Sequence, residues 1–487
     1  MRVQVRELLK KSYGMHFLLA CTFILCHIPL FQYIASPDPE FLVCCDVNRF
    51  LVAYASKMKA GLIPYRDFES EYPPVALFLF FLPTIATTDL GFYQYLFVIE
   101  QLVFEMIGLL IIGALLRRMQ VQREEAVFVV LGYVFLLASV GPILYSRYDM
   151  VVSVLVLATI YLFLIGKKRS AWVILAISVM TKPYAIVIAP LLLITQLHDA
   201  KKAVPALLEG LLLFSSTLLV ISLPFLLVSF HDYINSFLYH AERGVQIETL
   251  YSSIVHILHA LGAVSEVKIE FRYGAFELIS PISPFLSTLA FILTATVLLS
   301  VYLAFYKAKM WQQEDERLET KSFHLYRASV VAILAFILFY KVFSSQFLIW
   351  VYPLVPLVCR KADLRAKLIN GFFILIGGAT QLIYPLNYVL VNGLWINVVV
   401  VLLIRNVLLL LCLVLIGAWS QIENRVPRFS LLIITLLGIF LMELYPLRYH
   451  LQGFPSKFNI LLFLLAMVMF QLWGHPDGMD SMTMETT

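Results

Sequence analysis

Residues 46–74, DVNRFLVAYASKMKAGLIPYRDFESEYPP, form a long polar interruption near the start of a chain that is otherwise mostly apolar. Acidic and basic side chains crowd together here, and the stretch closes on the motif Tyr72-Pro73-Pro74. Proline suits the first turn of a helix, so this motif predicts a rigid helix start. An apolar run precedes the stretch and others follow it, which predicts an external loop between membrane spans.

Two helices that lie on the membrane surface are expected within this loop. Apolar and basic residues alternate at helical spacing over residues 48–60, a pattern typical of interfacial helices. The apolar run at residues 75–86 is too short to cross a bilayer, which takes about 20 residues. We therefore expect both segments to lie in the interface, within a first external loop at residues 36–91.

The composition indicates an integral membrane protein. Of the 487 residues, 61% are hydrophobic and only 14% are charged. Runs of roughly 18 or more apolar residues recur, and such runs are typical of membrane-spanning helices. We expect an all-α, multi-pass bundle of about 12 to 14 spans. The first span, residues 13–35, lacks a cleavage site and is expected to be an anchor rather than a signal peptide.

Basic residues predict the orientation of the chain. Arg2, Arg6, Lys10 and Lys11 precede the first span, and such flanks stay on the cytoplasmic side. Both termini are therefore expected in the cytoplasm, with the protein in the cell membrane. We interpret the net charge of +5 as basic flanks that set the orientation of the chain in the membrane, and not as a sign of nucleic-acid binding. The six cysteines lack metal-site spacing, so no metal site is predicted from them.

Charged and proline residues interrupt the remaining apolar blocks. Lys182-Pro183 breaks the block at residues 171–197, and proline makes such a break cheap because it has no backbone N–H. We expect two short spans there, with Lys182 at an outer hinge. The other expected spans are 92–116, 126–144, 150–165, 204–228, 284–305, 326–340, 347–358, 367–390, 394–419, 431–444 and 458–473.

This alternation of spans places most of the unusual polar residues on the outer face. They are Asp46, Glu69, Glu71, Arg147, Asp149, Lys182, Arg243, Glu248 and Lys341. Ionisable residues near a membrane core are costly and therefore indicate function. A carboxylate can take the proton of an acceptor hydroxyl, while cations stabilise a departing phosphate. The mixture therefore fits transfer of a sugar from a lipid phosphate, whose tail would need an apolar groove.

Structural roles remain open for the same residues. Asp46 could pair with Arg49 on an interfacial helix, which would be worth only tenths of a kcal/mol. Arg147 and Asp149 could form an ion pair within their loop. Lys182 and Lys341 could extend to the interface as snorkelling side chains, and Glu69 and Glu71 could be solvated loop charges.

Several local patterns, taken in order, resemble the GT-C superfamily of polytopic glycosyltransferases and, within it, the mannosyltransferase-like family 87. They are Asp46 with the run 61–74, Arg147-Tyr148-Asp149, Lys182-Pro183, the segment RGVQIE at 243–248 and the segment KVFSSQFLIW at 341–350. The resemblance implies a polyprenyl-phosphate hexose donor, most often mannose, and a lipid- or glycan-linked acceptor. It also implies inverting displacement with Asp46 as general base and no cofactor, while the extra acids of the loop leave divalent metal open.

The candidate site residues follow from this hypothesis. For the donor phosphate they are Lys341, Lys182, Arg243 and Arg147. For the acceptor or a second carboxylate they are Asp67, Glu69, Glu71 and Asp149. For the sugars they are Gln246, Glu248, Ser345, Gln346, Tyr65 and Tyr72.

The chain is expected to divide into a catalytic module at residues 1–358 and further transmembrane helices at residues 359–487. Two other functions are consistent with a membrane bundle. A transporter or flippase of lipid-linked sugars would place charges near the bilayer midplane and show repeat symmetry between its halves. A non-catalytic assembly subunit would not need so many external ionisable groups.

Overall fold

The computed structural model of the chain describes residues 23, 24, 27, 47–199, 203–308, 317–384 and 396–418. Asp46 lies outside the described residues. So do most of the expected first span and both of the expected spans after residue 418. The architecture below concerns the described residues alone.

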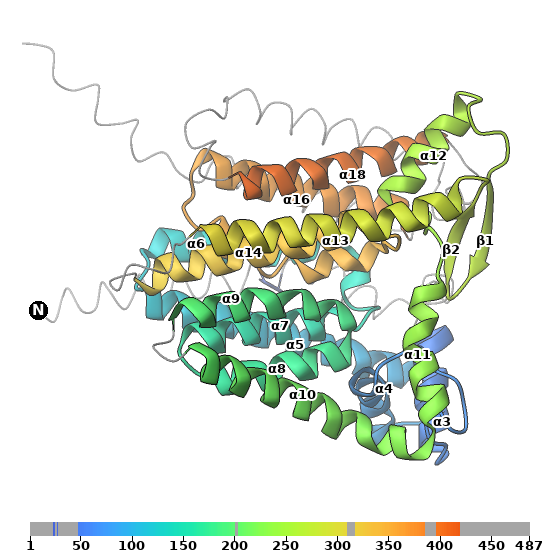
Figure 1. Ribbon diagram of the computed structural model, residues 1–487, viewed down its shortest axis with the longest axis horizontal. Coiled ribbons are helices and arrows are strands. Elements are labelled where there is room, and N and C mark those ends of the chain that lie inside the picture. Colours follow the sequence, from blue (N-terminus) through green and yellow to red (C-terminus); the bar gives the residue numbers. More distant parts are fainter. Residues whose placement is uncertain are drawn as a thin grey trace, which may run out of the picture.

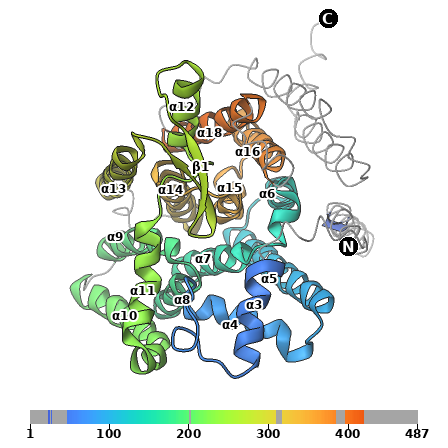
Figure 2. The same ribbon diagram turned by 90° about the vertical axis from the view of Figure 1, so that its right-hand side faces the viewer.

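A bundle of helices whose axes are roughly parallel or antiparallel, lying close to horizontal in Figure 1, forms the body of the molecule (Figures 1 and 2). In chain order these helices are α5 (Leu90–Met119), α6 (Arg123–Ser139), α7 (Asp149–Leu164), α8 (Lys168–Thr181), α9 (Ala189–Asp199), α10 (Ala203–Val228), α13 (Ser283–Lys307), α14 (Leu318–Phe339), α15 (Val355–Val358), α16 (Leu364–Ile383) and α18 (Ile396–Gly417). Among the described residues, six of them are long and apolar enough to cross a membrane: α5, α10, α13, α14, α16 and α18. The all-α polytopic fold expected from the sequence is confirmed.

Apart from three short 3₁₀ segments, η2 (Gly141–Leu144), η3 (Pro183–Ile188) and η4 (Ser345–Trp350), the remaining elements lie at one end of the bundle, on the right in Figure 1, which we call the capped end. They are the π-helical turn η1 (Val47–Leu51), α3 (Val52–Lys59), α4 (Pro74–Ala86), α11 (Phe230–Glu242), α12 (Leu250–Ala260), β1 (Lys268–Arg272) and β2 (Ala275–Ile279). The helices α3, α4 and α11 run across the ends of the long helices (Figures 1 and 2). This is the arrangement expected of interfacial helices, and α3 and α4 match the two predicted in the first loop.

The polar stretch after α10 is built from two helices and a β-hairpin. It contains α11, α12 and an antiparallel hairpin in which Lys268 of β1 faces Ile279 of β2. The two residues of the turn, Tyr273 and Gly274, have φ angles of 50° and 69°. Two left-handed residues in a row match the backbone twist of a tight hairpin, so the strands pair without a longer loop.

The break predicted in the block at residues 171–197 is present at Lys182. This residue is extended, with φ −154° and ψ 124°, as the ring of a following proline favours. Pro183 then begins the 3₁₀ segment η3 (Pro183–Ile188), which leads into α9. The hinge lies toward the capped end, because α8 runs toward that end and α9 runs back from it (Figure 1).

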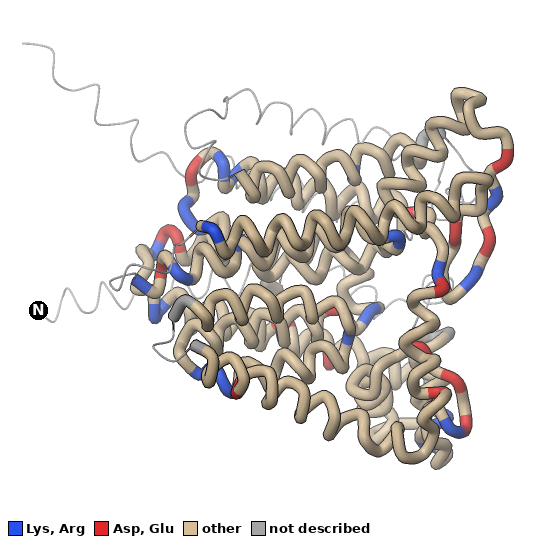
Figure 3. Tube along the Cα trace, in the orientation of Figure 1, with Lys and Arg blue, Asp and Glu red and all other residues tan. Residues whose placement is uncertain are grey.

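Most charged residues lie at the two ends of the helical bundle, and its middle contains few of them (Figure 3). Between the ends lies one large apolar core, to which α6, α7, α14 and α16 contribute fully buried side chains. This distribution is the one that a bilayer imposes, because charge is costly in hydrocarbon. We propose, as the basic flanks predict, that the capped end faces the exterior.

Matched Ser→Cys variants test this orientation. Ser265 is exposed before β1, at the capped end, and Ser170 is exposed near the start of α8, at the opposite end. In a background without the six native cysteines, a membrane-impermeant maleimide should label Ser265→Cys on intact cells and Ser170→Cys only after permeabilisation. Labelling of both from the same side would show that the alternation of spans is wrong.

Candidate functional site

The loop between α3 and α4 is held in a fixed conformation by Tyr65. Its backbone is left-handed, with φ 67°, and its N–H donates to the carbonyl of Phe68 at 2.9 Å. The Tyr65 hydroxyl donates to the carbonyl of Tyr72 at 2.5 Å. Its buried ring meets the ring of Tyr233 edge-on at 5.0 Å. Tyr65 therefore fixes the loop that carries the candidate acids.

The three acids of this loop have different environments. Hydrogen bonds from the Arg66 guanidinium and the N–H of Ile63 hold the pKa of Asp67 at about 2. A carboxylate with so low a pKa is a poor proton acceptor near neutral pH. Glu69 is exposed, whereas Glu71 is half-buried.

Glu71 is the loop acid that lies nearest to the centre of the capped end. Its Oε2 accepts a hydrogen bond from the Tyr54 hydroxyl at 2.7 Å. Together with burial, the negative charge of Glu71 helps to raise the pKa of the Tyr148 hydroxyl. The carbonyl of Glu71 lies 3.1 Å from Nε2 of His240. Burial lowers the pKa of His240 to about 4, so the ring is neutral at pH 7 and its N–H donates to that carbonyl. Glu71 is thus tied to both α3 and α11.

The centre of the capped end is a buried ion pair between Asp149 and Lys182. The Nζ of Lys182 lies 2.6 Å from Oδ1 of Asp149, which also accepts a hydrogen bond from Nε1 of Trp350 at 2.5 Å. Asp149 is fully buried and lies in the first turn of α7, where the helix dipole stabilises a negative charge. Its Oδ2 accepts no hydrogen bond from the described residues.

Aromatic rings surround the Lys182 ammonium. It lies 4.7 Å from the ring centroid of Tyr148, 5.3 Å from that of Trp350 and 5.5 Å from that of Phe347. The Trp350 ring is in turn stacked against Tyr184, with ring centroids 3.8 Å apart. Cation–π contacts of this kind stabilise a desolvated cation. The lysine is therefore held in place rather than extended into the lipid interface.

Two arginines add positive charge to this centre. Arg147 and Arg243 both lie close enough to Lys182 to repel its charge. Arg147 is buried and donates a hydrogen bond to the Tyr384 hydroxyl at 2.9 Å. The Nε of Arg243 is buried and forms no hydrogen bond with the described residues. We call Arg147, Asp149, Lys182 and Arg243 the cationic cluster, because three of its four charged groups are positive.

Lys341 supports the cluster from its edge. Its Nζ donates to the carbonyl of Ala241 at 2.7 Å, at the C-terminal end of α11 where a positive charge is favourable. Glu277 of β2 accepts the N–H of Gly244 at 2.7 Å. A Cβ at Gly244 would lie 2.7 Å from Glu277 Oε2, so a larger residue there would displace the Glu277 carboxylate. Together these contacts fix both sides of Arg243.

A second buried ion pair joins Glu248 to Arg405 of α18. Nη1 of Arg405 donates to Oε2 of Glu248 at 2.8 Å, and its Nη2 donates to the Glu248 carbonyl at 2.5 Å. Ser345 donates to the same Oε2 at 2.7 Å. Arg405 and Glu248 are 0% and 2% exposed in their side chains, and the Phe343 ring lies 4.2 Å from the guanidinium. This pair connects α12, η4 (Ser345–Trp350) and α18.

The structure therefore separates the residues that the sequence grouped together. Arg147, Asp149, Lys182 and Arg243 lie together, and Glu71 lies beside them. Glu248 is paired with Arg405 and accepts a hydrogen bond from the Ser345 hydroxyl. Gln246 is paired with Ser344, its Nε2 lying 2.7 Å from the Ser344 oxygen. Gln346 is half-buried, while Tyr72 packs edge-on against Tyr148 with ring centroids 5.8 Å apart.

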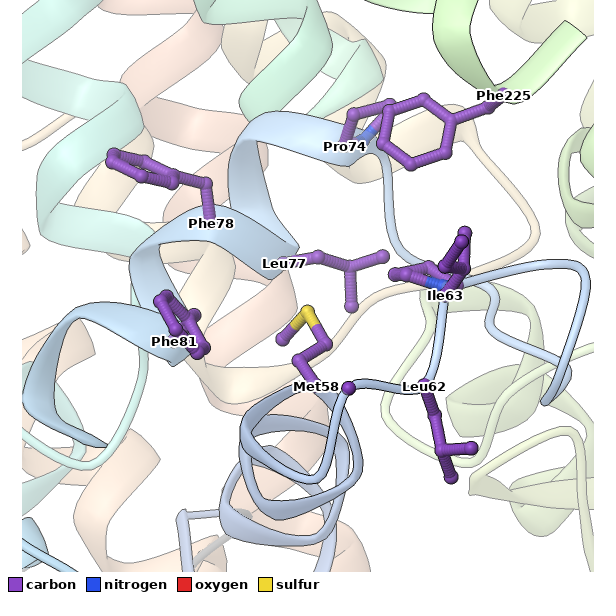
Figure 4. Close-up of a pocket in the computed structure, with 10 residues that line it drawn as sticks. Met58, Leu62, Ile63, Pro74, Leu77, Phe78, Phe81 and Phe225 are labelled. Atoms are coloured by element: carbon purple, nitrogen blue, oxygen red, sulfur yellow. The ribbon is translucent and has the colours of Figure 1, made fainter. Parts of the chain in front are cut away.

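An apolar groove of about 370 Å³ lies between α3, α4 and the end of α10 (Figure 4). Its walls include Met58, Ile63, Leu77, Phe78 and Phe225. Pro74 also lines it, two residues after Tyr72, so the groove begins close to the loop that faces the cationic cluster. Its lining suits a hydrocarbon chain.

Sequence reasoning missed four residues of this region. Arg405 had a usable signal, because it is the one charged residue in the apolar run 394–419. Trp350 stood in a quoted motif but was given no role. Glu277 and Tyr384 had no signal, since their partners are far away in the sequence. Among the described residues, no group of three or more His, Cys, Asp or Glu side chains could hold a metal ion.

No family model and no curated protein matches the sequence. Among solved structures, the chain is similar to the crystal structure of ArnT from Cupriavidus metallidurans in the apo state. The sequence identity is 13%, the match covers 84% of this chain and 77% of that chain, and the TM-score is 0.43.

Breaking the Glu248–Arg405 pair should destabilise the protein. Arg405→Ala leaves a buried carboxylate without its cation, which costs about 3–5 kcal/mol. The control is Arg169→Ala, which removes an ion pair with Glu209 at 2.6 Å whose side chains are 79% and 46% exposed. That exposed pair should contribute about 0–1 kcal/mol. Thermal unfolding in detergent measures both, and equal midpoints would contradict a structural role for Arg405.

Proposed function

We propose that this protein is a membrane glycosyltransferase that takes its sugar from a polyprenyl-phosphate donor. The observation that carries the proposal is the cationic cluster, in which Arg147, Lys182 and Arg243 exceed the charge of Asp149. Positive groups held close together repel one another, and an anion bound among them relieves that repulsion. Two arginines and a lysine are the side chains that bind phosphate best.

The cluster would act on the leaving group. In the proposed reaction an acceptor hydroxyl attacks the anomeric carbon while the bond from that carbon to the phosphate oxygen breaks. The polyprenyl phosphate departs with the electron pair, and Arg243, Lys182 and Arg147 stabilise its charge. The attack comes from the opposite face, so the configuration at the anomeric carbon is inverted.

A carboxylate must accept the hydroxyl proton as the new bond forms. We propose Asp46 for this role, on the basis of the resemblance of its loop to that of family 87. The residue after Asp46, Val47, is buried in one apolar cluster with Tyr65 and Tyr148. Glu71 is the second candidate, because it is the loop acid whose negative charge contributes to the raised pKa of Tyr148.

The groove between α3 and α4 would receive the lipid tail. It is apolar and follows directly from the loop that carries Glu71 and Tyr72. We propose a hexose, mannose in the first place, as the transferred sugar, and an external lipid- or glycan-linked hydroxyl as the acceptor. The catalytic module would be residues 1–358, supported by the helices of residues 359–487, from which α18 contributes Arg405.

Asp46→Asn tests the general base. Asparagine keeps the size of aspartate but cannot accept the proton, so turnover should fall by about 10²-fold or more. Donor binding should persist, because the loss is confined to the transition state. Purified protein in lipid nanodiscs, assayed with a panel of polyprenyl-phosphate sugars, measures both quantities.

The matched control for this assay is Glu69→Gln, an exposed acid of the same loop, which should turn over like the wild type. Full activity of Asp46→Asn would remove Asp46 from the mechanism, and Glu71→Gln would then be the variant to measure. No transfer by the wild type with any donor of the panel would count against the function itself.

Arg243→Gln tests the phosphate site. Hydrogen bonds to charged groups contribute about 1.5–3 kcal/mol, so the Kd for a polyprenyl phosphate should rise by about 10- to 100-fold. The salt dependence of binding should also weaken, because one charge is lost. The control is Arg272→Gln, an exposed arginine of β1 that pairs with Glu270. Equal affinity in both variants, measured by titration calorimetry at two ionic strengths, would exclude Arg243 from the site.

A further inference from the structure

The helix α11 has three faces with different surroundings. Tyr233 and Ser236 are buried against the protein, and the Tyr233 hydroxyl lies 2.7 Å from that of Ser222 in α10. A second face carries His231 and Asn235, which are exposed and joined by a side-chain hydrogen bond of 2.8 Å. The third face is apolar and also exposed.

This third face is a stripe of large hydrophobic side chains. Phe230, Ile234 and Leu238 are 65%, 39% and 53% exposed, and their spacing of four residues places them on one side of the helix. We call them the α11 stripe. A helix with one buried, one polar and one exposed apolar face is typical of helices that lie in a membrane interface.

The stripe continues a surface that already faces lipid. The helix α10 is long and apolar enough to cross a membrane, and only 11% of its apolar window is buried inside the protein. Its last turns expose Leu223 and Leu227, which are 43% and 78% exposed. Phe230 follows across a single bend, and α11 then runs across the ends of the spans (Figures 1 and 2).

We propose that the α11 stripe docks on the surface of the outer lipid leaflet, so that the bilayer holds α11 in place. This helix is also joined to the candidate site at several points. His240 holds the carbonyl of Glu71, Lys341 holds the carbonyl of Ala241, and Arg243 follows the last turn directly. Membrane contact would therefore position Arg243. The importance of this position rests on the proposed function, whereas the docking of α11 does not.

Spin labels on neighbouring residues test the docking. In the full chain without native cysteines, reconstituted in lipid vesicles, Ile234→Cys and Leu238→Cys should be more accessible to oxygen than to a water-soluble nickel complex. The controls His231→Cys and Asn235→Cys, on the polar face, should show the reverse. Preferential access of the nickel complex at all four positions would overturn the proposal. Exclusion of both reagents from the stripe would also overturn it, because another part of the chain or a second copy would then cover it.

A binding measurement tests the consequence for Arg243. Ile234→Asp places a charge on the lipid-facing stripe, and Asn235→Asp places the same charge on the polar face. In nanodiscs, Ile234→Asp should weaken binding of a polyprenyl phosphate by about tenfold, the equivalent of one lost apolar contact, while Asn235→Asp should not. Equal binding would overturn the positioning of Arg243 by the membrane. If the labels report lipid contact but the wild type binds no polyprenyl phosphate, the docking stands and the proposed function falls.

Discussion

The capped end depends on the buried ion pair between Asp149 and Lys182. Removing two charges from water costs several kcal/mol for each ion, so the pair persists only where other groups complete its contacts. Trp350 supplies a hydrogen bond to the carboxylate, and three aromatic rings face the ammonium. The first turn of α7, the hinge after α8 and the end of η4 are therefore held at one point.

Other features follow from this constraint. The hinge must stop α8 at Lys182, which the following proline ensures, and α7 must begin with Asp149. Ser153, one turn further along α7, donates a hydrogen bond of 2.8 Å to the carbonyl of Ile349 and fixes η4 against the same helix. A rigid scaffold of this kind holds charges at fixed distances, which is what stabilisation of a departing phosphate requires.

The two buried ion pairs of this end have different surroundings. Glu248 and Arg405 satisfy each other and their neighbours, and no positive charge is left over. At the Asp149–Lys182 pair, by contrast, the arginines Arg147 and Arg243 lie close enough to Lys182 to repel its charge. The first arrangement joins helices, whereas the second is suited to an anionic ligand, and only the second is part of our functional proposal.

The sequence by itself determined the helical class, the surface helices α3 and α4, and the break at Lys182. These features depend on local composition and on proline, whose effects act within a few residues. It also singled out Lys182 and Asp149 as unusual, but only the tertiary structure paired them across 33 positions and added Trp350 at a separation of 201. Contacts between residues so far apart in the sequence depend on how the helices pack, because no local sequence pattern indicates which helix ends will lie together. For the same reason the hairpin, the partner of Glu248 and the apolar stripe of α11 were decided by the fold.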